Sequence, residues 1–577
     1  MDEQLDVEKR KYWLLLPLYA VCPVIAFYLM EAYEHNPFVE VRFQAQWLNI
    51  ILFELIAWAL YFFIGRMHIA VRVLFALSMI FGLVNHYVMT FRSTPFVPWD
   101  IFSVSTAASV AGNYDFTPNA RVVTVTGAFI ILMALAHFLK KVPRISWKIG
   151  PVSGILVTLV LCLFVRSLQN EDFQTKHYLY PFLFTPVYMT QVNGMAVTFA
   201  MNLAYVVVDK PQGYSAKEAQ EILDSYEYET EDISKDAEML PNIIVVMDEA
   251  FSDLAGLGNL ETNKDYMPFM HKMQQGQENT ITGYAQVSVC GGNTANSEFE
   301  FLTGNTMAFL PGGSIPYQQY IKKETPSMAS YLKSLGYVTY AQHPYHAGGW
   351  NRDTVYPLLG FENMDFLPDY VGASYVRKYV SDASDIQHII DTYEKKESGK
   401  PMFLFNVTMQ NHGGYTEEYS DFTNEITASQ HSEALNQYLS LIYQSDQALE
   451  NLISYFSDVK EPTVVVFFGD HQPSDAVASV VAASFDDPTR RYQVPYLIWA
   501  NYDIEEKTGC NTSLNYLSAQ VLSTAGVQTN AYQNFLLELR DVYPSLSAAG
   551  QQQKGKNDEK LTVYQKLQYY QLFEGNQ

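Results

Sequence analysis

The sequence predicts an α-helical membrane domain of five spans, followed by an extracellular α/β domain with a mostly parallel sheet. Five long apolar stretches fall within the first third of the 577 residues, and strand-like runs alternate with helix-like segments from Pro241 onward. The charge changes as well, because residues 1–170 carry a net charge of +3 whereas the whole chain carries −24. A chain of this length exceeds one ordinary core, so at least two units are expected.

Each apolar stretch is long enough to cross a bilayer, which takes about 20 residues in a helix. So many apolar runs would leave a soluble protein little polar surface, so we expect transmembrane helices. No small-residue cleavage site follows the first stretch, which is therefore expected to be an uncleaved anchor. The predicted spans are residues 12–30, 47–65, 71–89, 122–139 and 149–165.

The Lys and Arg residues of the short loops predict the orientation. Basic residues precede the first span at 9–11, follow the second at Arg66 and Arg72, and fill residues 140–148. All three groups fall on one side if the N-terminus is cytoplasmic, which places the chain after the fifth span outside the cell. The predicted parts are a membrane domain (1–168), a junction with linker helices (169–240), an extracellular domain (241–545) and a C-terminal tail (546–577).

Two features of the membrane half have alternative interpretations. Glu54 lies inside the second predicted span, where an ionisable residue is either functional or paired with Asn49 or a neighbouring helix. Residues 182–208 form a sixth apolar stretch, but Pro186 and Gly194 interrupt it. We expect an interfacial junction there, because a sixth span would place the acidic part in the cytoplasm.

The polar half alternates strands with helices, which favours a mostly parallel sheet covered on both faces. Residues 210–229 predict a turn and an acidic amphipathic linker helix, and the Gln-rich tail from Ser545 is expected to pack loosely. Predicted elements are strands at 242–249, 401–412, 463–471 and 492–500, a helix at 432–456, and a helix, a break at Gly336 and a strand within 328–343.

Chemically capable side chains follow three of these strands. Glu249 follows the first, His412 ends the third, and Asp470 and His471 stand after Gly469, which is expected to break its strand. Ligands of parallel sheets bind beyond the carboxyl ends of the strands, so these groups are expected to converge on one edge. Two carboxylates and an imidazole can hold a cation with room left for a substrate.

Thr294 is a candidate nucleophile for phosphoryl transfer. It follows Gly291-Gly292 and begins the helix-like segment TANSEFEFL. A helix N-terminus and a metal both favour an alkoxide beside a bound phosphate. The alternative is that Thr294 or Asn293 only caps the helix.

The remaining composition excludes some classes of protein. The acidic half lacks the basic face that nucleic-acid binding requires, although carboxylates suit a local cation site. Four cysteines do not make a disulfide framework, and a single Cys290–Cys510 bridge stays an alternative.

Several segments, in the family's order, resemble the lipoteichoic acid synthase family, the membrane phosphoglycerol transferases of the alkaline phosphatase/sulfatase superfamily. KPQGYSAKE and the closing YQKLQYYQLFEGNQ are also similar, so the resemblance covers nearly the whole chain. Departures are the Cys290-Gly291-Gly292 loop and Tyr569-Tyr570, where relatives are expected to carry an acid. The matching segments are NIIVVMDEAFSDL, GGNTANSEFEFLTGNT, HPYHAGGWNRD, NVTMQNHGGY and FGDHQPS.

The resemblance implies roles for individual residues. Thr294 matches the nucleophile, and Arg352 can grip a phosphate with two donors. Neutral His side chains are expected to donate to phosphate oxygens. His346 has no clear match, and Asp353 is expected to be structural. The implied metal ligands are Glu249, Thr294, Asp470 and His471, and the implied substrate-binding residues are His343, Trp350, Arg352 and His412.

The implied activity is a metal-dependent transfer of glycerol phosphate through a threonine-bound intermediate, with Mn²⁺ or Mg²⁺ favoured by the carboxylate-rich ligands. The expected donor is phosphatidylglycerol, and the expected acceptor is a cell-envelope polymer such as lipoteichoic acid or a glycolipid. The alternatives are a phosphoethanolamine transferase, a phosphodiesterase and a non-catalytic envelope receptor. A sulfatase is disfavoured because Cys290 is followed by Gly-Gly-Asn-Thr rather than by the C-x-P-x-R pattern of those enzymes.

Overall fold

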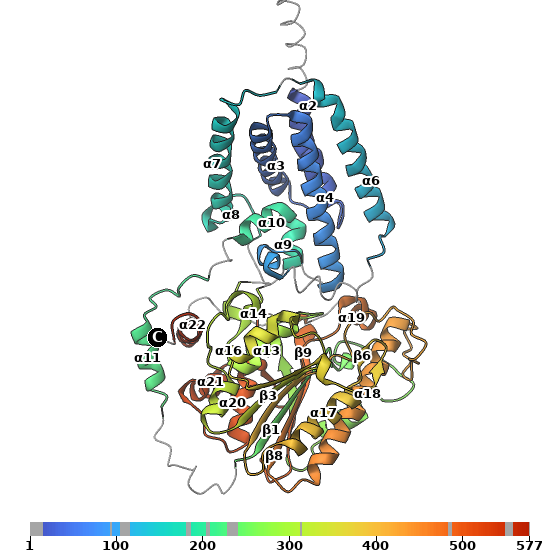
Figure 1. Ribbon diagram of the computed structural model, residues 1–577, viewed down its shortest axis with the longest axis vertical. Helices are drawn as coiled ribbons and strands as arrows, with labels where there is room; N and C mark the ends of the chain where they lie inside the picture. The colour runs from blue at the N-terminus through green and yellow to red at the C-terminus, as the bar shows by residue number, and fades with distance from the viewer. Residues whose placement is uncertain are drawn as a thin grey trace, which may run out of the picture. The chain divides into compact units, whose positions relative to one another are not determined.

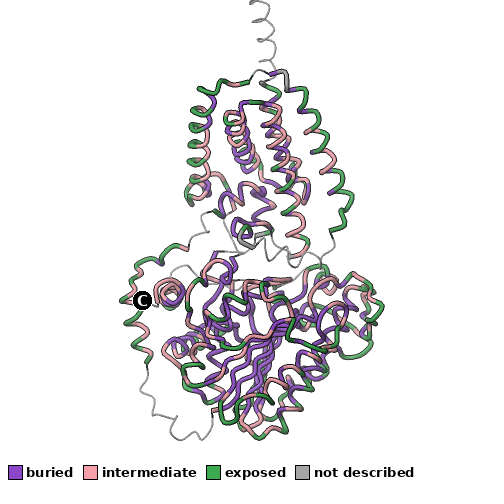
Figure 2. The backbone as a smooth tube through the Cα atoms, in the orientation of Figure 1, coloured by how far each residue is buried: buried purple, intermediate pink, exposed green. Residues whose placement is uncertain are grey.

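The computed structural model describes residues 16–92, 95–103, 116–142, 144–180, 186–203, 208–227, 240–311, 314–482, 487–548 and 558–575. These residues form two compact units, each with its own core (Figures 1 and 2). Among the described residues, the N-terminal unit comprises those in 16–101 and 116–203, and the C-terminal unit comprises those from 208 onward together with Phe102 and Ser103. The basic residues 9–11 and the first residues of the first predicted span lie outside the described residues.

The N-terminal unit is a bundle of long apolar helices. Within the described residues, four helices are long and apolar enough to cross a membrane, so the prediction of five spans is not confirmed. The helix of the first predicted span, α2, has 16 described residues, fewer than a span needs. The bundle consists of the shorter helix α2 (Leu16–Glu31) and the four long helices α3 (Phe43–Ile64), α4 (Met67–Arg92), α6 (Ala120–Leu135, extended by the 3-10 turn Ala136–Lys141) and α7 (Gly150–Leu168).

Glu54 and Asn49, whose pairing was one of the alternatives for this unit, have different partners. Glu54 accepts a hydrogen bond from Trp58 Nε1 at 3.0 Å, on its own helix. Asn49 instead donates to the Asn193 carbonyl at 2.7 Å and accepts from Val197 N at 3.1 Å. Of the two interpretations of Glu54, a pairing with Asn49 is therefore not seen, and Asn49 ties α3 to the segment that follows α7.

That segment consists of short helices rather than a sixth span. The helices α9 (Pro186–Asn193) and α10 (Met195–Asn202) have eight residues each and are separated at Gly194. Eight residues are too few to cross a bilayer as a helix. The expectation of a non-spanning junction therefore holds for the described part, while residues 182–185 and 204–207 lie outside it. A further short helix, α8 (Glu171–Lys176), precedes them.

The C-terminal unit is built on an eight-stranded, mostly parallel sheet (Figure 1). Its order is β10-β2-β9-β8-β1-β7-β3-β4, and only β9 runs antiparallel to its two neighbours. The strands are β1 (Asn242–Asp248), β2 (Thr280–Gln286), β3 (Val338–His343), β4 (Asn363–Phe366), β7 (Met402–Val407), β8 (Thr463–Gly469), β9 (Gln493–Ala500) and β10 (Thr512–Ser513), and a separate hairpin pairs β5 (Tyr375–Val376) with β6 (Tyr379–Val380).

Helices cover both faces of the sheet, which explains why the central strands are apolar throughout. Every residue of β1, β7 and β8 is buried, as Figure 2 shows for the centre of this unit. One face packs against α13 (Thr294–Thr303), α15 (Met328–Ser334), α16 (Arg352–Leu358) and α20 (Leu514–Thr524). The other packs against α12 (Pro268–Gln274), α17 (Asp382–Lys395), α18 (Glu433–Ser457) and α19 (Asp475–Val481).

The linker and the tail form a smaller core beside this sheet. The predicted linker helix is α11 (Ala216–Asp224), which packs with α21 (Ala531–Val542) and α22 (Glu559–Tyr569, followed by a π-helical turn at Tyr570–Glu574). Tyr564 and Leu567 are fully buried, and Tyr564 donates to the Gly304 carbonyl at 2.7 Å. The expectation of a loosely packed tail is therefore wrong for residues 558–575.

Candidate active site

The strands β8, β1 and β7 are parallel neighbours, so their carboxyl ends share one edge of the sheet. Glu249 directly follows β1, and Asp470 and His471 directly follow β8. His412 lies in the loop five positions beyond the end of β7. The predicted convergence of these side chains is therefore confirmed by the strand order.

Gly469 is needed at the end of β8 because another backbone approaches it. It is the last residue of the strand, and its Cα pairs with that of Asp248. A Cβ at this position would lie 1.9 Å from the carbonyl oxygen of Phe251. The strand ends at Gly469, as predicted, and the absence of a side chain there lets the chain after β1 pass close over the end of β8.

This close approach fixes the carboxylate of Asp470. Its Oδ1 accepts from Ala250 N and from His471 N, both at 2.7 Å. Its Oδ2 is buried and has no hydrogen-bond partner. One oxygen therefore orients the group, and the other is left for a ligand.

His471 has a ring nitrogen, Nε2, that is free to bind a ligand beside the open oxygen of Asp470. Its Nδ1 lies 2.9 Å from the Gln472 carbonyl, which can only accept, so Nδ1 carries a proton. The Nε2 atom is buried without a hydrogen-bond partner, 3.2 Å from Asp470 Oδ2 and 3.8 Å from Glu249 Oε1. A backbone carbonyl that holds one ring nitrogen is typical of a metal-binding histidine.

These three residues fit a divalent cation. Their ligand atoms lie within 4.8 Å of one another, and all three side chains are buried. Burial raises the pKa of Glu249 well above its usual value, and the neighbouring Asp470 charge raises it further. Two carboxylates and a lone pair facing one another repel unless a positive charge lies between them. The donors are oxygen-rich with one imidazole, which suits Mn²⁺ or Mg²⁺.

Thr294 stands beside this cluster as the first residue of α13. Its Oγ1 donates to Glu249 Oε2 at 3.3 Å. Asn293 occupies the N-cap position, but its side chain makes no capping hydrogen bond and its Oδ1 is buried without a partner. The capping alternative therefore fails for both residues.

The Gly-Gly pair before the helix has a structural purpose that the sequence did not reveal. Gly291 and Gly292 have φ angles of 69° and 149°, and Asn293 follows at 67°. Such angles strain residues with a side chain. Gly291 N also donates to the Gln472 carbonyl at 2.9 Å, which joins the Thr294 loop to the loop of the metal cluster.

Arg352 is predicted to bind a phosphate. One edge of its guanidinium is held by Glu298, which the sequence analysis missed. Its Nε and Nη2 donate to Glu298 Oε1 at 3.1 and 2.5 Å, and Tyr356 Oη donates to Glu298 Oε2 at 2.8 Å. Nη1 makes only a 3.4 Å contact with the Gly349 carbonyl. The edge that carries Nη1 is therefore the one that can reach an anion.

His343 is a neutral proton acceptor. Burial lowers its pKa well below the usual value, and the Arg352 charge lowers it further. Its Nδ1 donates to the Val407 carbonyl at 2.9 Å, which leaves Nε2 without a proton. The expectation that neutral histidines donate to phosphate oxygens therefore fails for His343.

His412 is also neutral, because burial lowers its pKa to about 3 and the Arg377 charge adds to this. Its Nδ1 lies 3.2 Å from Tyr379 Oη. His412 and Arg352 both perturb the pKa of His343, and His471 perturbs that of His412, so the predicted substrate and metal residues form one electrostatic cluster.

The loop before α16 carries the other predicted residues. Trp350 is half-buried, with a left-handed φ of 55°, in the turn Gly349–Asn351 that precedes Arg352. His346 and Asp353 are exposed. Cys290 and Cys510 are free thiols, so the bridge between them is not formed.

A second layer of buried acids lies behind the metal residues, and sequence reasoning missed it as well. Asn411 Nδ2 links Asp248 Oδ1 at 2.9 Å to Ser445 Oγ at 2.8 Å, and Ser445 donates to Asp382 Oδ2. Burial raises the pKa of Asp382 to about 6. The network fixes the end of β1, and its only sequence signal is the Asp248-Glu249 pair.

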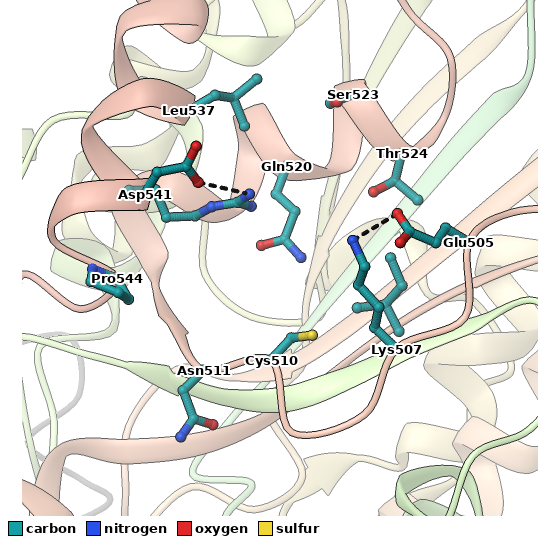
Figure 3. Close-up of a pocket in the computed structure, with 12 residues that line it drawn as sticks. Glu505, Lys507, Cys510, Asn511, Gln520, Ser523, Thr524, Leu537, Asp541 and Pro544 are labelled. Carbon is teal, nitrogen blue, oxygen red and sulfur yellow. Dashed lines mark ion pairs between the residues drawn. The ribbon is translucent and has the colours of Figure 1, made fainter.

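A cavity of about 720 Å³ lies elsewhere in the C-terminal unit, and Figure 3 shows its lining. Its side chains come from β2, the loop that carries Lys507 and Cys510, and the helices α20 and α21. None of the predicted site residues lines it, so this cavity is not the candidate active site.

Comparisons with known proteins agree with this fold. Residues 241–527 match the Sulfatase family. A Rhizobium meliloti (strain 1021) protein, whose name assigns it to cyclic beta-1,2-glucan modification, is 27% identical over 524 residues, covering 86% of this chain and 79% of that protein. Lipoteichoic acid synthase 1 of Bacillus subtilis (strain 168) is 23% identical over 239 residues, covering 40% of this chain and 36% of the synthase.

A solved structure shares the fold of the C-terminal unit. The Streptococcus pyogenes phosphoglycerol transferase GacH, in complex with sn-glycerol-1-phosphate, superposes with a TM-score of 0.53 and 24% identity, covering 63% of this chain and 95% of GacH. Residues 241–527 of the chain therefore match the Sulfatase family, and the C-terminal unit shares its fold with GacH.

Proposed function

We propose that this protein is a membrane phosphoglycerol transferase that moves glycerol phosphate from phosphatidylglycerol to a cell-envelope glycan or polymer. One observation carries the proposal: the hydroxyl of Thr294 lies 3.3 Å from Glu249, at the N-terminus of α13 and beside the buried cluster of Glu249, Asp470 and His471. An alcohol held against an electropositive helix end is suited to attack phosphorus.

The reaction has two steps. Thr294 Oγ1 gives up its proton and attacks the phosphorus of the lipid, the bond from phosphorus to the diacylglycerol oxygen breaks, and that oxygen takes up a proton as diacylglycerol leaves. Glycerophosphoryl-threonine remains. An acceptor hydroxyl then attacks the same phosphorus, Thr294 Oγ1 leaves and takes up a proton, and the proton of the acceptor passes to the enzyme. His343 Nε2, kept unprotonated by the Val407 contact, is suited to accept that proton.

Glu249, Asp470, His471 and Thr294 would hold the divalent cation, for which we propose Mn²⁺ with Mg²⁺ as the second candidate. Such a cation neutralises the carboxylates and stabilises negative charge on the transferring phosphoryl group. The free edge of Arg352 would hold a phosphate oxygen, and His412 and Trp350 would contact the glycerol. These assignments rest on the shared electrostatic cluster and on the loop that carries Trp350 and Arg352.

The names of the relatives support the donor and the acceptor class. GacH is a phosphoglycerol transferase, and the relatives include a lipoteichoic acid synthase and a protein named for glucan modification. The apolar N-terminal helices suit a lipid donor, which has to be reached at a membrane surface. We propose that the C-terminal domain acts on the outer side of the cell membrane.

Incubating the purified full chain with glycerol-labelled phosphatidylglycerol and Mn²⁺ tests this proposal. We expect diacylglycerol release and a labelled peptide that contains Thr294. Thr294→Ala should abolish both, whereas Thr294→Ser, which keeps the hydroxyl, should retain part of the activity.

Other results of this experiment would support one of the alternative functions instead. Cleavage of phosphatidylethanolamine with phosphatidylglycerol left intact would make the protein a phosphoethanolamine transferase. Rapid release of free glycerol phosphate, in the presence of envelope glycans that stay unlabelled, would make it a phosphodiesterase. Full biological activity of Thr294→Ala in cells would contradict catalysis and support a receptor.

A further inference from the structure

The N-terminal unit contains an apolar pocket that the proposed chemistry does not use. It has a volume of about 500 Å³ and lies against the second half of α2 and the loop that follows. Cavities of this size hold ligands of several hundred daltons. Its walls are formed by Val24, Ile25, Tyr28, Leu29 and Phe38.

The wall of the pocket combines ordered and exposed aromatic residues. Tyr28 and Phe38 stack with ring centroids 4.4 Å apart, and Tyr28 Oη donates to Gln46 Oε1 at 2.8 Å. Phe38 is nevertheless 69% exposed. Aromatic rings at the end of an apolar helix are typical of the boundary between lipid and water.

One arginine lines this mostly apolar pocket, whose other polar lining residues are His35 and Asn36. Arg121, in the first turn of α6, borders it and is exposed. Its Nη1 donates to the backbone carbonyl of Glu34. Among the described residues, no carboxylate oxygen lies within 4.0 Å of the Arg121 guanidinium.

The acids on either side of the pocket's loop, Glu34 and Glu40, are already engaged. The Glu34 carboxylate lies 2.8 Å from His86 Nδ1, and the Glu40 carboxylate accepts from Gln191. Arg121 therefore keeps most of its donors for an external anion, beside a pocket that suits a hydrocarbon chain. This combination matches the two ends of one amphipathic molecule.

We propose that this pocket binds an anionic glycerophospholipid, with an acyl chain along α2 and the phosphate at Arg121. Only the role of this bound lipid as the donor rests on the proposed function. Under the orientation predicted from the basic loops, the end of α2 and the start of α6 face outward. This is the leaflet from which an extracellular transferase draws its lipid.

Three variants of the full chain separate this site from general lipid binding. Arg121→Gln removes the cation and keeps hydrogen-bonding capacity. Ala32→Trp fills the pocket, because Ala32 lines it and is only half-buried. Arg166→Gln is the matched control, since Arg166 is an exposed cation at the C-terminal end of α7 that does not line the pocket.

The first measurement is binding without turnover. The delipidated chain is titrated with phosphatidylglycerol or phosphatidylcholine in nanodiscs, and retained lipid is counted by native mass spectrometry. We expect Arg121→Gln to weaken phosphatidylglycerol binding about tenfold, because one charge-assisted contact is lost. Ala32→Trp should abolish it, and Arg166→Gln should match the natural chain. Equal retention by Arg121→Gln and the natural chain, or equal binding of phosphatidylcholine, would overturn the proposal.

The second measurement links the pocket to turnover. Release of 4-nitrophenol from glycerophosphoryl-4-nitrophenol, which has no acyl chain, is compared with diacylglycerol release from phosphatidylglycerol. We expect both pocket variants to raise KM for the lipid about tenfold and to leave the soluble substrate unaffected. If the natural chain cleaves neither substrate, the proposed function fails while the binding measurement still decides the pocket. Unchanged lipid kinetics in both variants would show that the bound lipid is not the donor.

Discussion

Replacing Glu298 by glutamine is predicted to destabilise the C-terminal unit and to impair Arg352 at the same time. Glu298 is fully buried, and Arg352 is 2% exposed. Glu298 accepts from Nε and Nη2 of Arg352 and from Tyr356 Oη. Glutamine keeps the shape but removes the charge and turns N–H donors toward the guanidinium. Removing one partner of a buried ion pair costs about 3–5 kcal/mol, because the other charge stays buried.

Thermal unfolding of the full chain and initial rates of diacylglycerol release measure the two effects. Tyr356→Phe is the matched control, since it removes one hydrogen bond to the same carboxylate and should cost only about 1 kcal/mol. The double variant Glu298→Gln/Arg352→Gln removes both charges. It should be more stable than Glu298→Gln alone and should stay inactive, because stability needs charge balance whereas activity needs the arginine.

If Glu298 positions Arg352, the single variant should show an effect that a purely structural role does not predict. Glu298→Gln should lower kcat for phosphatidylglycerol even at temperatures where the variant is fully folded. If Glu298→Gln melts like the natural chain and turns over at the same rate, the ion pair does not position Arg352. A double variant less stable than both single variants would likewise refute the electrostatic explanation.

Three further predictions concern the cluster and its support. Gly469→Ala should destabilise the domain by at least about 3 kcal/mol, because its Cβ would lie 1.9 Å from the Phe251 carbonyl oxygen. A variant with the same thermal unfolding midpoint as the natural chain would contradict this close approach. Removing bound metal with a chelator should lower the thermal unfolding midpoint, added Mn²⁺ should restore it, and the midpoint of His471→Ala should change little with metal. A thermal midpoint of the natural chain that does not depend on metal would argue against the site. Glu300 lies in α13, the helix that Thr294 begins, and is buried. Burial raises its pKa to about 7 from the usual 4.5, so the folded state binds an extra proton and stability should fall by about 3 kcal/mol as the pH rises from 4.5 to 7. Glu300→Gln should remove that part of the fall in unfolding experiments at pH 5 and 7.5, and an identical pH dependence in both proteins would count against it.

The sequence by itself determined the sheet and the edge at which the site lies. The runs before Glu249 and Asp470 are apolar without alternation, which is the pattern of parallel strands buried on both faces. Parallel strands present their carboxyl ends together, so the candidate metal ligands could be grouped from chain order alone. Local patterns of this kind also predicted a linker helix within residues 210–229, which is α11, and a junction rather than a sixth span in residues 182–208.

Only the tertiary structure decided what surrounds and orients those residues. Glu298 reaches Arg352 across 54 positions, and the Asp470 carboxylate is set by Ala250 N across 220 positions. Such contacts leave no local period or spacing in the sequence. The proton positions on His343 and His471 likewise depend on which carbonyl packs against each ring. Composition and periodicity record burial and secondary structure, whereas the partner of a buried polar atom is chosen by how distant segments pack.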